Sequence, residues 1–406
     1  MRRAAWGVLL LYVFAVPWEY SLELGPPLGN IARIIGIALL LATIHAVLKK
    51  GAIRRPSALH WATLSLYLWV CCSFFWTIDQ AVTLERMRGT FQEMMVVWLA
   101  WELARDRSDL RVMVRAMVAG CWVLALLTVW NAVSPGAGAQ IRFAAAGQDP
   151  NDVARYLDLG FPLAAYLIDD DRRIASRVMA WCYFLLGGAA VLLTASRGGF
   201  VAALVALVGS AIVLWRRYRG VVLGTAWALP LGALAVWAAM PPEIMRRISS
   251  IPQELRGGNL NQRLNIWSAG WDAFKEAPVL GHGAGSFVTA SGLSPIDTAH
   301  NTALSILVEM GVAGLILALL VLIFATRAAL QARASMRGAL VTALCVWLVS
   351  SAVGTTAESR TTWMLFAMAA VAGRLSAENE QPAWCRRAIA TMDNGRMAAG
   401  DAEAAH

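Results

Sequence analysis

Long apolar runs alternate with short polar segments along almost the whole chain. Runs of about 20 apolar residues, the length that spans a bilayer as a helix, recur roughly twelve times. They lie near residues 4–24, 28–48, 57–77, 90–104, 112–133, 153–168, 175–195, 199–215, 220–240, 301–326, 338–354 and 362–375. The first run has no small-residue cleavage site and is expected to be a span rather than a signal peptide. This pattern predicts an all-α polytopic membrane protein with about 12 transmembrane helices.

One polar segment, residues 241–300, is long enough to resemble a domain. Inside it, apolar side chains recur at spacings of three, four and three, which is one face of a helix. These are Leu264, Trp267, Trp271 and Phe274, and Pro278 is expected to end the helix. An amphipathic helix of this kind is expected to lie along the outer membrane surface.

These patterns divide the chain into four parts. Residues 1–240 form spans 1 to 9, 241–300 form a periplasmic loop with the amphipathic helix, 301–375 form spans 10 to 12, and 376–406 form a cytoplasmic tail. No internal repeat is visible.

Composition agrees with a membrane protein. Hydrophobic residues make up 58% of the 406 residues and charged residues 15%, whereas soluble proteins average about a quarter charged. The net charge of +9 is scattered among short loops, which disfavours a nucleic-acid partner. With the N-terminus in the cytoplasm, every inside loop is basic, as the positive-inside rule requires. These segments are 49–55, 105–111, 169–177, 215–220, 327–337 and the tail from Arg374. We therefore expect a bacterial inner-membrane protein with both termini cytoplasmic.

The sequence gives little support for a metal site or for redox chemistry. The six cysteines show no paired C-x-x-C spacing, so neither a zinc site nor disulfides are expected. The one acidic cluster, residues 169–171, falls on the cytoplasmic side beside two arginines, and no pair of outside carboxylates replaces it. We expect no metal and no cofactor.

Arginines on the predicted outer side are exceptions to the charge rule. Arg197 lies in a hairpin between two spans and precedes two glycines, so it either reaches lipid phosphates or binds an anion. The residue alone leaves both interpretations open. Several such guanidiniums could converge on one pyrophosphate, the group that arginine suits best. The others are Arg86, Arg88, Arg142, Arg155, Arg263 and Arg360. The run 149–152 before Arg155 is also a strong helix N-cap signal.

His300 lies where the long polar loop passes into the apolar helix of span 10. A half-buried histidine there would titrate near neutral pH. Taken alone, it is more often structural than a catalytic base. Glu309, nine residues further on, is about 13 Å deeper along the helix, too far to orient His300. We interpret Glu309 as a polar contact between helices.

An ordered set of motifs in and after the large loop resembles a known family. The set runs Arg263-x-x-x-Trp267-x-Ala269, Phe274, Pro278, Gly281-x-Gly283-x-Gly285, then His300-Asn301-x-x-Leu304-x-x-Leu307-x-Glu309-x-Gly311-x-x-Gly314. It resembles the O-antigen ligase / Wzy C-terminal superfamily across roughly 263–314. The hairpin 194–199 and the start of span 6 around Asn151 also look like that superfamily.

The resemblance implies a GT-C-like, metal-independent, inverting glycosyltransferase. Such an enzyme moves O-antigen from undecaprenyl pyrophosphate to a sugar hydroxyl of lipid A–core at the periplasmic face. It implies that His300, Arg263 and Arg197 are catalytic. Candidates for binding pyrophosphate or acceptor are Arg142, Arg155, Arg86, Arg88 and Asn301. Arginines would neutralise the departing pyrophosphate while His300 orients the acceptor hydroxyl. The expected partners are undecaprenyl-pyrophosphate-linked O-antigen, lipid A–core and membrane lipids.

Two other activities in the superfamily use the same donor. An O-antigen polymerase transfers to another lipid-linked repeat, and a protein O-oligosaccharyltransferase transfers to protein. The short predicted tail favours the ligase over the latter, which tends to be longer. A transporter would place charge near the membrane midplane, whereas polar residues here gather at the outer ends of the spans, so we rank it last.

Overall fold

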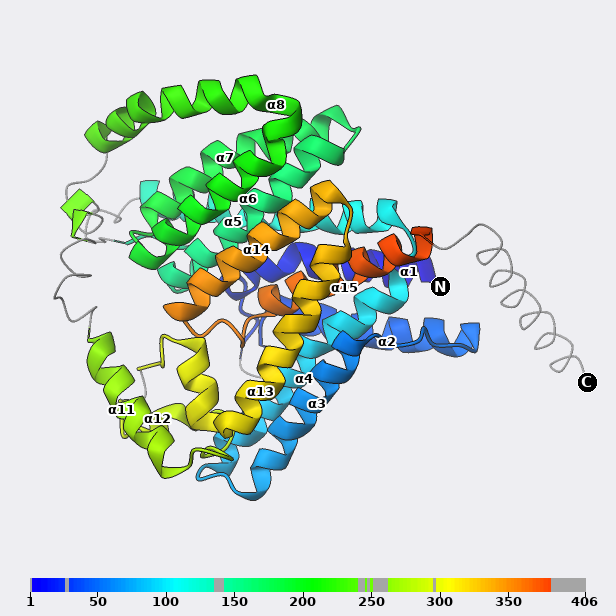
Figure 1. The fold of residues 1–406 in the computed structure, drawn as a ribbon, viewed down its shortest axis with the longest axis vertical. Coiled ribbons are helices and arrows are strands. Elements are labelled where there is room, and N and C mark those ends of the chain that lie inside the picture. The colour runs from blue at the N-terminus through cyan, green and yellow to red at the C-terminus, as the bar shows by residue number, and fades with distance from the viewer. Residues whose placement is uncertain are drawn as a thin grey trace, which may run out of the picture.

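The computed structural model describes residues 2–25, 29–134, 142–239, 245–246, 249–250, 262–294 and 297–380. Helices make up nearly all of this part of the chain (Figure 1). In order they are α1 (Arg2–Ala15), η1 (Val16–Ser21), α2 (Ile31–Lys50), α3 (Ala58–Cys72), η2 (Ser73–Phe75), α4 (Gln80–Leu103), α5 (Arg107–Val133), α6 (Pro150–Asp170), α7 (Ile174–Leu193), α8 (Arg197–Ala239), α11 (Arg263–Glu276), α12 (Phe287–Ala290), α13 (Thr302–Gln331), α14 (Ala334–Ala352) and α15 (Arg360–Glu380).

Each predicted span overlaps a helix, and the all-α fold class is confirmed. Spans 8 and 9 fall in the 43-residue α8, which is interrupted at Tyr218 by non-helical backbone angles. Seven described helices are long and apolar enough to cross a membrane. The last helix continues to Glu380, past the predicted start of the tail at 376. The rest of that tail, and much of the loop predicted over 241–300, lie outside the described residues.

Short polar side chains fix where several helices begin. An N-cap side chain accepts a hydrogen bond from a backbone N–H of the first helical turn, which otherwise lacks a partner. The residues that do this are Asn30, Asp79, Asp106, Asp149 and Asn301. Asp149 confirms the N-cap that the run 149–152 indicated.

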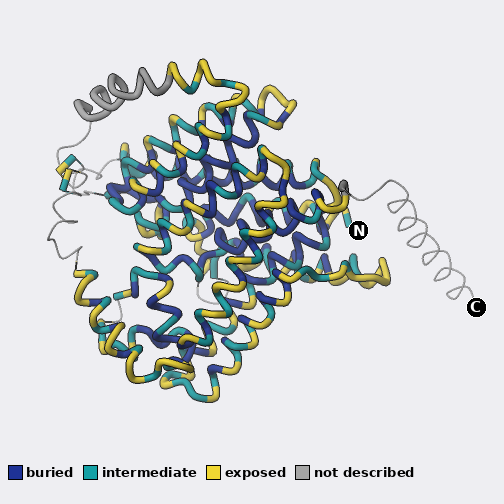
Figure 2. Tube along the Cα trace, viewed as in Figure 1, coloured by how far each residue is buried: buried dark blue, intermediate teal, exposed yellow. Residues whose placement is uncertain are grey.

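The helices bury a common interior and expose apolar side chains outward. Figure 2 shows the burial concentrated inside the bundle, and α6 is buried along almost its whole length. Large aliphatic side chains point away from the interior on the outer helices, with Leu41 62%, Leu185 79% and Ile212 70% exposed. Apolar surface of this extent needs a lipid environment. The chain is therefore a membrane protein.

The basic segments share one end of the bundle. Near the helix ends, Lys50 and Arg54 both bond Glu102, and Arg374 donates to the Ala104 carbonyl. Further basic contacts at the same ends are Arg2 with Leu103, Arg111 with Asp170, Arg115 with Asp171 and Arg217 with Asp169. We call this the basic end. The connections that follow α5, α7 and α14 lie at the opposite end.

Helix α13 is broken inside the bundle at Gly311, whose φ is 64° and ψ −170°. The break frees helical carbonyls, and the segment 278–285 supplies their partners. The amides of His282 and Gly283 donate to the carbonyls of Val308 and Glu309 at 2.9 and 2.8 Å. Non-helical backbone is tolerated at membrane depth only when it is enclosed by protein in this way. The break therefore ties the large loop to α13.

Helix α11 lies where the amphipathic helix was predicted, but it buries a different face. Ile266, Gly270 and Ala273 are buried, whereas Leu264 and Trp271 are about half exposed. The shift has a steric cause at Gly270, since a Cβ there would lie 2.9 Å from the Phe287 ring. The bare glycine lets α12 and α13 pack against this face, and packing therefore outweighs the tryptophan pattern.

Candidate functional site

Backbone strain is concentrated at the predicted site residues. Among the described residues, three non-glycine residues have positive φ: Ala195 at 48°, Gln262 at 63° and His300 at 45°. Ala195 lies two residues before Arg197, Gln262 precedes Arg263, and the third is His300 itself. Such conformations cost of order 1–3 kcal/mol each and cluster at functional sites. All three proposed catalytic residues thus stand at or beside a strained turn.

Asn151, in the first turn of α6, connects two of the loops at the end opposite the basic end. Its side-chain oxygen accepts hydrogen bonds from Arg142 at 2.8 Å and from the Ser196 hydroxyl at 2.8 Å. Arg142 also donates to the Thr194 carbonyl at 3.2 Å. The neighbouring Arg197 donates to the Ser250 hydroxyl at 2.7 Å. These contacts hold the hairpin 194–197 beside the start of α6.

Arg155, one turn further along α6, joins this group to the loop between α14 and α15. It is ion-paired with Asp152, and its guanidinium packs against Gly354, where a Cβ would collide with it. The Gly354 carbonyl accepts a 2.7 Å hydrogen bond from Thr302, which begins α13. The Arg155 Nε is buried without a hydrogen-bond partner among the described residues. An unsatisfied buried donor of this kind is costly and is expected where an anionic ligand completes the site.

His300 is half-buried beside the start of α13, and its ring lies 3.3 Å from the Thr298 hydroxyl. Burial lowers the pKa of His300, and the positive charge of Arg263 lowers it further. Arg155 acts in the same direction, whereas Asp149 and Asp297 oppose it. These influences place His300 within electrostatic reach of both arginines. They also keep its imidazole neutral at neutral pH, the form that can accept a proton.

We call Arg142, Asn151, Arg155, Arg197, Arg263 and His300 the arginine–histidine cluster. Asn301, predicted to bind substrate, makes two hydrogen bonds within the protein that hold the backbone beside His300. Its side-chain oxygen accepts the Leu304 amide at 3.0 Å, and its side-chain nitrogen donates to the Ala352 carbonyl at 3.3 Å. Both ends of the amide are therefore used within the protein, and Asn301 positions His300 at the start of α13.

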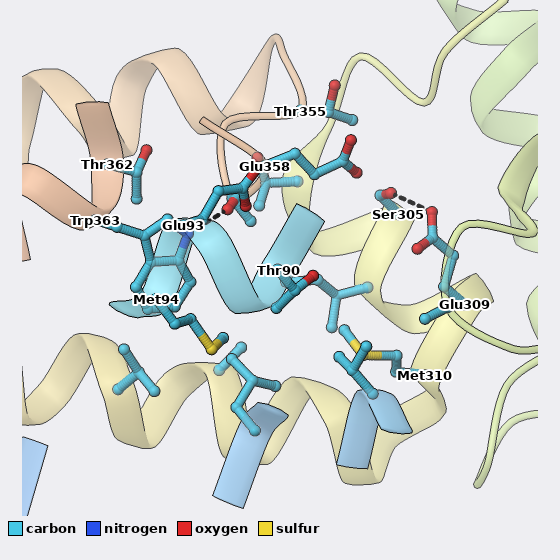
Figure 3. A pocket seen from close by; sticks show the side chains of 18 of the residues that line it. Thr90, Glu93, Met94, Ser305, Glu309, Met310, Thr355, Glu358, Thr362 and Trp363 are labelled. Atoms are coloured by element: carbon cyan, nitrogen blue, oxygen red, sulfur yellow. Dashed lines mark hydrogen bonds between the residues drawn. The ribbon is translucent and has the colours of Figure 1, made fainter. Parts of the chain in front are cut away.

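An elongated cavity lies between α3, α4, α13, α14 and α15, near the same end of the bundle. Figure 3 shows the carboxylates of Glu93, Glu309 and Glu358 along one side, with Met94 and Met310 opposite. Much of the rest of its lining is apolar, including Leu66, Val70, Val321, Leu322 and Phe366. Thr302 also lines the cavity, so the cavity reaches the turn that carries His300.

Arg86 lines the acidic side of this cavity. It is ion-paired with Glu358, and Glu309 and Glu93 also act on it electrostatically. Three carboxylates around one guanidinium disfavour a pyrophosphate at Arg86. Arg88 is exposed and makes no hydrogen bond or ion pair with the described part of the chain. The structure thus places Arg155 and Arg263 near His300 and holds Arg142 and Arg197 around the start of α6, but gives Arg86 and Arg88 other surroundings.

A separate small pocket lies beside Arg155. It is lined by Arg155, Ser350, Thr356 and Ser359 among others, and it shares Trp347 and Thr362 with the larger cavity. The arrangement places cationic groups at the end of a largely apolar space, which suits a molecule with an anionic head and an apolar tail.

Sequence reasoning missed two parts of this site. Asn151 was interpreted as part of an N-cap turn, yet its side chain links Arg142 to Ser196. The short loop 353–359, which supplies Gly354 and Glu358, was read only as an outer connection. A polar residue in the first turn of a span was the available signal for Asn151. Residues 353–359 gave no sequence signal, because the role of Gly354 depends on packing against Arg155.

The fold and the cluster define an integral membrane protein with a cationic site beside an apolar cavity. Residues 182–319 match the Wzy_C family model, described as O-antigen ligase, which supports the resemblance to the superfamily that the motifs indicated. The match includes Arg197, Arg263 and His300, whereas Arg142, Asn151 and Arg155 lie before it.

One solved structure is similar in shape to the chain. It is titled "Structural coordination of polymerization and crosslinking by a peptidoglycan synthase complex". The TM-score is 0.43 at 18% identity, over 78% of this chain and 97% of that one. No curated protein sequence matches the chain.

Proposed function

We propose that the protein is an O-antigen ligase. It would transfer O-antigen polysaccharide from undecaprenyl pyrophosphate to a sugar hydroxyl of lipid A–core, without a metal, at the periplasmic face of the inner membrane. The observation that carries this proposal is that His300 lies within electrostatic reach of Arg263 and Arg155, while the hairpin before Arg197 is bonded to the start of the same helix, α6. The family match supports transfer of a lipid-linked polysaccharide in a membrane.

In the proposed reaction the acceptor oxygen attacks the anomeric carbon of the donor. The bond from that carbon to the pyrophosphate oxygen breaks, and the pyrophosphate leaves with the electron pair. Attack from the opposite side inverts the anomeric configuration. The neutral imidazole of His300 accepts the hydroxyl proton, and the cluster arginines stabilise the growing charge on the pyrophosphate.

The cavity gives the donor lipid a place beside these groups. Its apolar lining would hold part of the polyprenyl chain, while the pyrophosphate lies towards Arg155, whose Nε has no partner among the described residues. On the acidic side, Arg86 already ion-pairs with Glu358, so the pyrophosphate would be directed to the arginine–histidine cluster instead.

A choice of acceptors tests this function. Purified protein is given undecaprenyl-pyrophosphate glycan together with lipid A–core, a lipid-linked repeat and a pilin-like protein. We expect product on lipid A–core, and the same yield in EDTA. Extension of the lipid-linked repeat would identify a polymerase, and glycosylated protein an oligosaccharyltransferase. Loss of activity in EDTA that a divalent ion restores would contradict the metal-free mechanism.

Variants test the site within the same assay. His300→Ala should lower transfer by about 10²–10⁴-fold, the usual value of general-base catalysis, while the protein remains folded in the membrane. Arg142→Gln should also lower transfer, because it removes a cation and the bond to Asn151. Arg88→Gln is the matched control, since Arg88 is exposed and outside the cluster. Near-normal transfer by His300→Ala would remove His300 from the reaction.

A further inference from the structure

A second polar groove lies at the basic end, away from the arginine–histidine cluster. It is formed where α3 begins and where α13 and α15 end. Its polar lining includes Arg327, Gln331, Arg374 and Glu378, and its apolar lining includes Leu59, Phe324 and Ala370. The proposed transfer reaction makes no use of these residues.

Arg374 is built into the wall of this groove. It donates to the Ala104 carbonyl at 2.6 Å and to Glu378 at 3.0 Å, and its guanidinium lies 5.1 Å from the centre of the Trp101 ring. Its side chain is only 7% exposed, yet its Nε is buried without a partner among the described residues. A fixed guanidinium with an unused donor is a ready site for an anion.

The groove carries an excess of positive charge. Glu378 lies between Arg374 and Arg54, with its carboxylate 4.0 Å from the Arg54 guanidinium. Arg327, at the other side, is exposed and makes no hydrogen bond or ion pair with the described residues. Among the residues that line the groove, one carboxylate, Glu378, therefore stands against two guanidiniums, and the charge of Arg327 is not neutralised within the groove.

The other face of the groove is apolar and lies between helices. Helices α13 and α15 touch at Gly373, where a Cβ would lie 2.8 Å from the Ala328 carbonyl oxygen. This close approach forms a floor, with Phe324 and Ala370 at its sides. A ligand there would meet cations at one end and hydrocarbon along its length, which is the polarity of a phospholipid.

We propose that this groove binds an anionic phospholipid, with the phosphate between Arg327 and Arg374 and an acyl chain along the floor. Charge complementarity favours this occupant, because basic pockets between transmembrane helices on the cytoplasmic side bind anionic headgroups. Arginine also offers two parallel donors to one phosphate. The lipid fastens the ends of α13 and α15 together at the side opposite the reaction.

Lipid binding to the full-length protein in detergent tests the proposal. Native mass spectrometry with phosphatidylglycerol, cardiolipin and phosphatidylethanolamine should show retention of the two anionic lipids. Arg327→Gln should weaken that binding on the order of fivefold, the usual contribution of one basic residue near a membrane surface. Arg327→Lys should retain most of it. Arg333→Gln is the matched control, an exposed arginine at the same end and outside the groove.

Three kinds of result would overturn the site. Equal binding of phosphatidylethanolamine would show that the charge plays no part, and equal loss in Arg327→Gln and Arg333→Gln would show only diffuse attraction. A photo-crosslinking residue at Gln331, which lines the groove, identifies the occupant in membranes. A phospholipid adduct supports the proposal, whereas a crosslink to residues 381–406 or to a second copy contradicts it. Glycan transfer is assayed separately, so neither outcome depends on the proposed function.

Discussion

At the scale of single residues, His300 combines two unusual properties. Its backbone is left-handed, and its pKa is lowered by burial and by Arg263. Left-handed backbone is uncommon outside glycine, so the surrounding turn must hold it in place. The Asn301 side chain does so by joining the start of α13 to the end of α14. The neutral imidazole of His300 therefore depends on the charge of Arg263 and on a backbone that the Asn301 side chain fixes.

The pH dependence of transfer tests the electrostatic part. If neutral His300 is the active form, the rate should fall as the pH drops through its lowered pKa. Arg263→Gln removes a positive neighbour and raises that pKa, so the acid limb of the pH–kcat profile should move to higher pH. Arg197→Gln is the comparison, since the largest charge effects on His300 come from Arg263, Asp149, Arg155 and Asp297. It should lower kcat without moving the limb, and a stationary limb in Arg263→Gln would contradict this assignment.

The sequence indicated many of these residues, but not their contacts. His300, Arg197 and Arg263 stood out as polar exceptions at the predicted outer side, and motifs strengthened them. The positive φ of Ala195 and His300 was invisible, because tertiary packing decides that angle at non-glycine residues. Asn151 was hidden for a similar reason, since its N-cap setting gave a sufficient local explanation for a residue that also bonds Arg142.

At the scale of elements, the least expected feature is the break in α13. Hydropathy predicted one continuous span over 301–326, because an apolar helix tolerates a glycine in the sequence pattern. The break depends on the remote segment 278–285, whose amides take the place of helical partners. Helix α11 is a second case in which packing decides the structure: the fit between Gly270 and Phe287, rather than its tryptophans, sets which face is buried.

Substitution of Gly311 tests how much the break contributes. The backbone there is accessible essentially only to glycine, and a Cβ would collide with the Val279 carbonyl. Gly311→Ala should destabilise the protein by about 3 kcal/mol or more, from backbone strain and overpacking together. Gly292→Ala is a close control, because its φ is +62° but nothing lies within 4 Å of a Cβ.

Thermal unfolding in detergent, followed by tryptophan fluorescence, compares the two variants. Gly292→Ala should lose only about 1–2 kcal/mol, the cost of left-handed backbone alone. Similar losses in both variants would show that the collision at Val279 is relieved by a small shift, and that the break has little energetic weight.

At the scale of the whole molecule, the basic end and the arginine–histidine cluster lie at opposite ends of the helix bundle. The segments predicted to face the cytoplasm share contacts at the basic end, for example Arg54 with Glu102 and Arg217 with Asp169. The arginine–histidine cluster lies at the other end. The sequence predicted this polarity from loop charge alone, since the positive-inside rule constrains every loop in turn. It could not predict which spans meet, because lipid-facing and protein-facing residues are equally apolar in a membrane.

Labelling from one side of the membrane tests the orientation. In a background without the native cysteines, Thr298→Cys should react with a membrane-impermeant maleimide added outside spheroplasts. Arg333→Cys should react only after the membrane is opened. Both positions are exposed in the structure, so burial does not decide the result. The reverse pattern would place His300 on the cytoplasmic side and would contradict the proposed periplasmic reaction.

The joint between the 278–285 segment and α13 also constrains how the protein is made. The ribosome delivers His282 and Gly283 before the residues whose carbonyls receive their amides. The loop segment therefore cannot make these bonds until α13 has been synthesised. A reporter fused between the 278–285 segment and α13 reports on a chain that still lacks these hydrogen bonds. Residues 262–294 expressed alone also lack the carbonyls of Val308 and Glu309 that accept them. Topology mapping and fragment production for this chain should be planned around fusions placed after Val312.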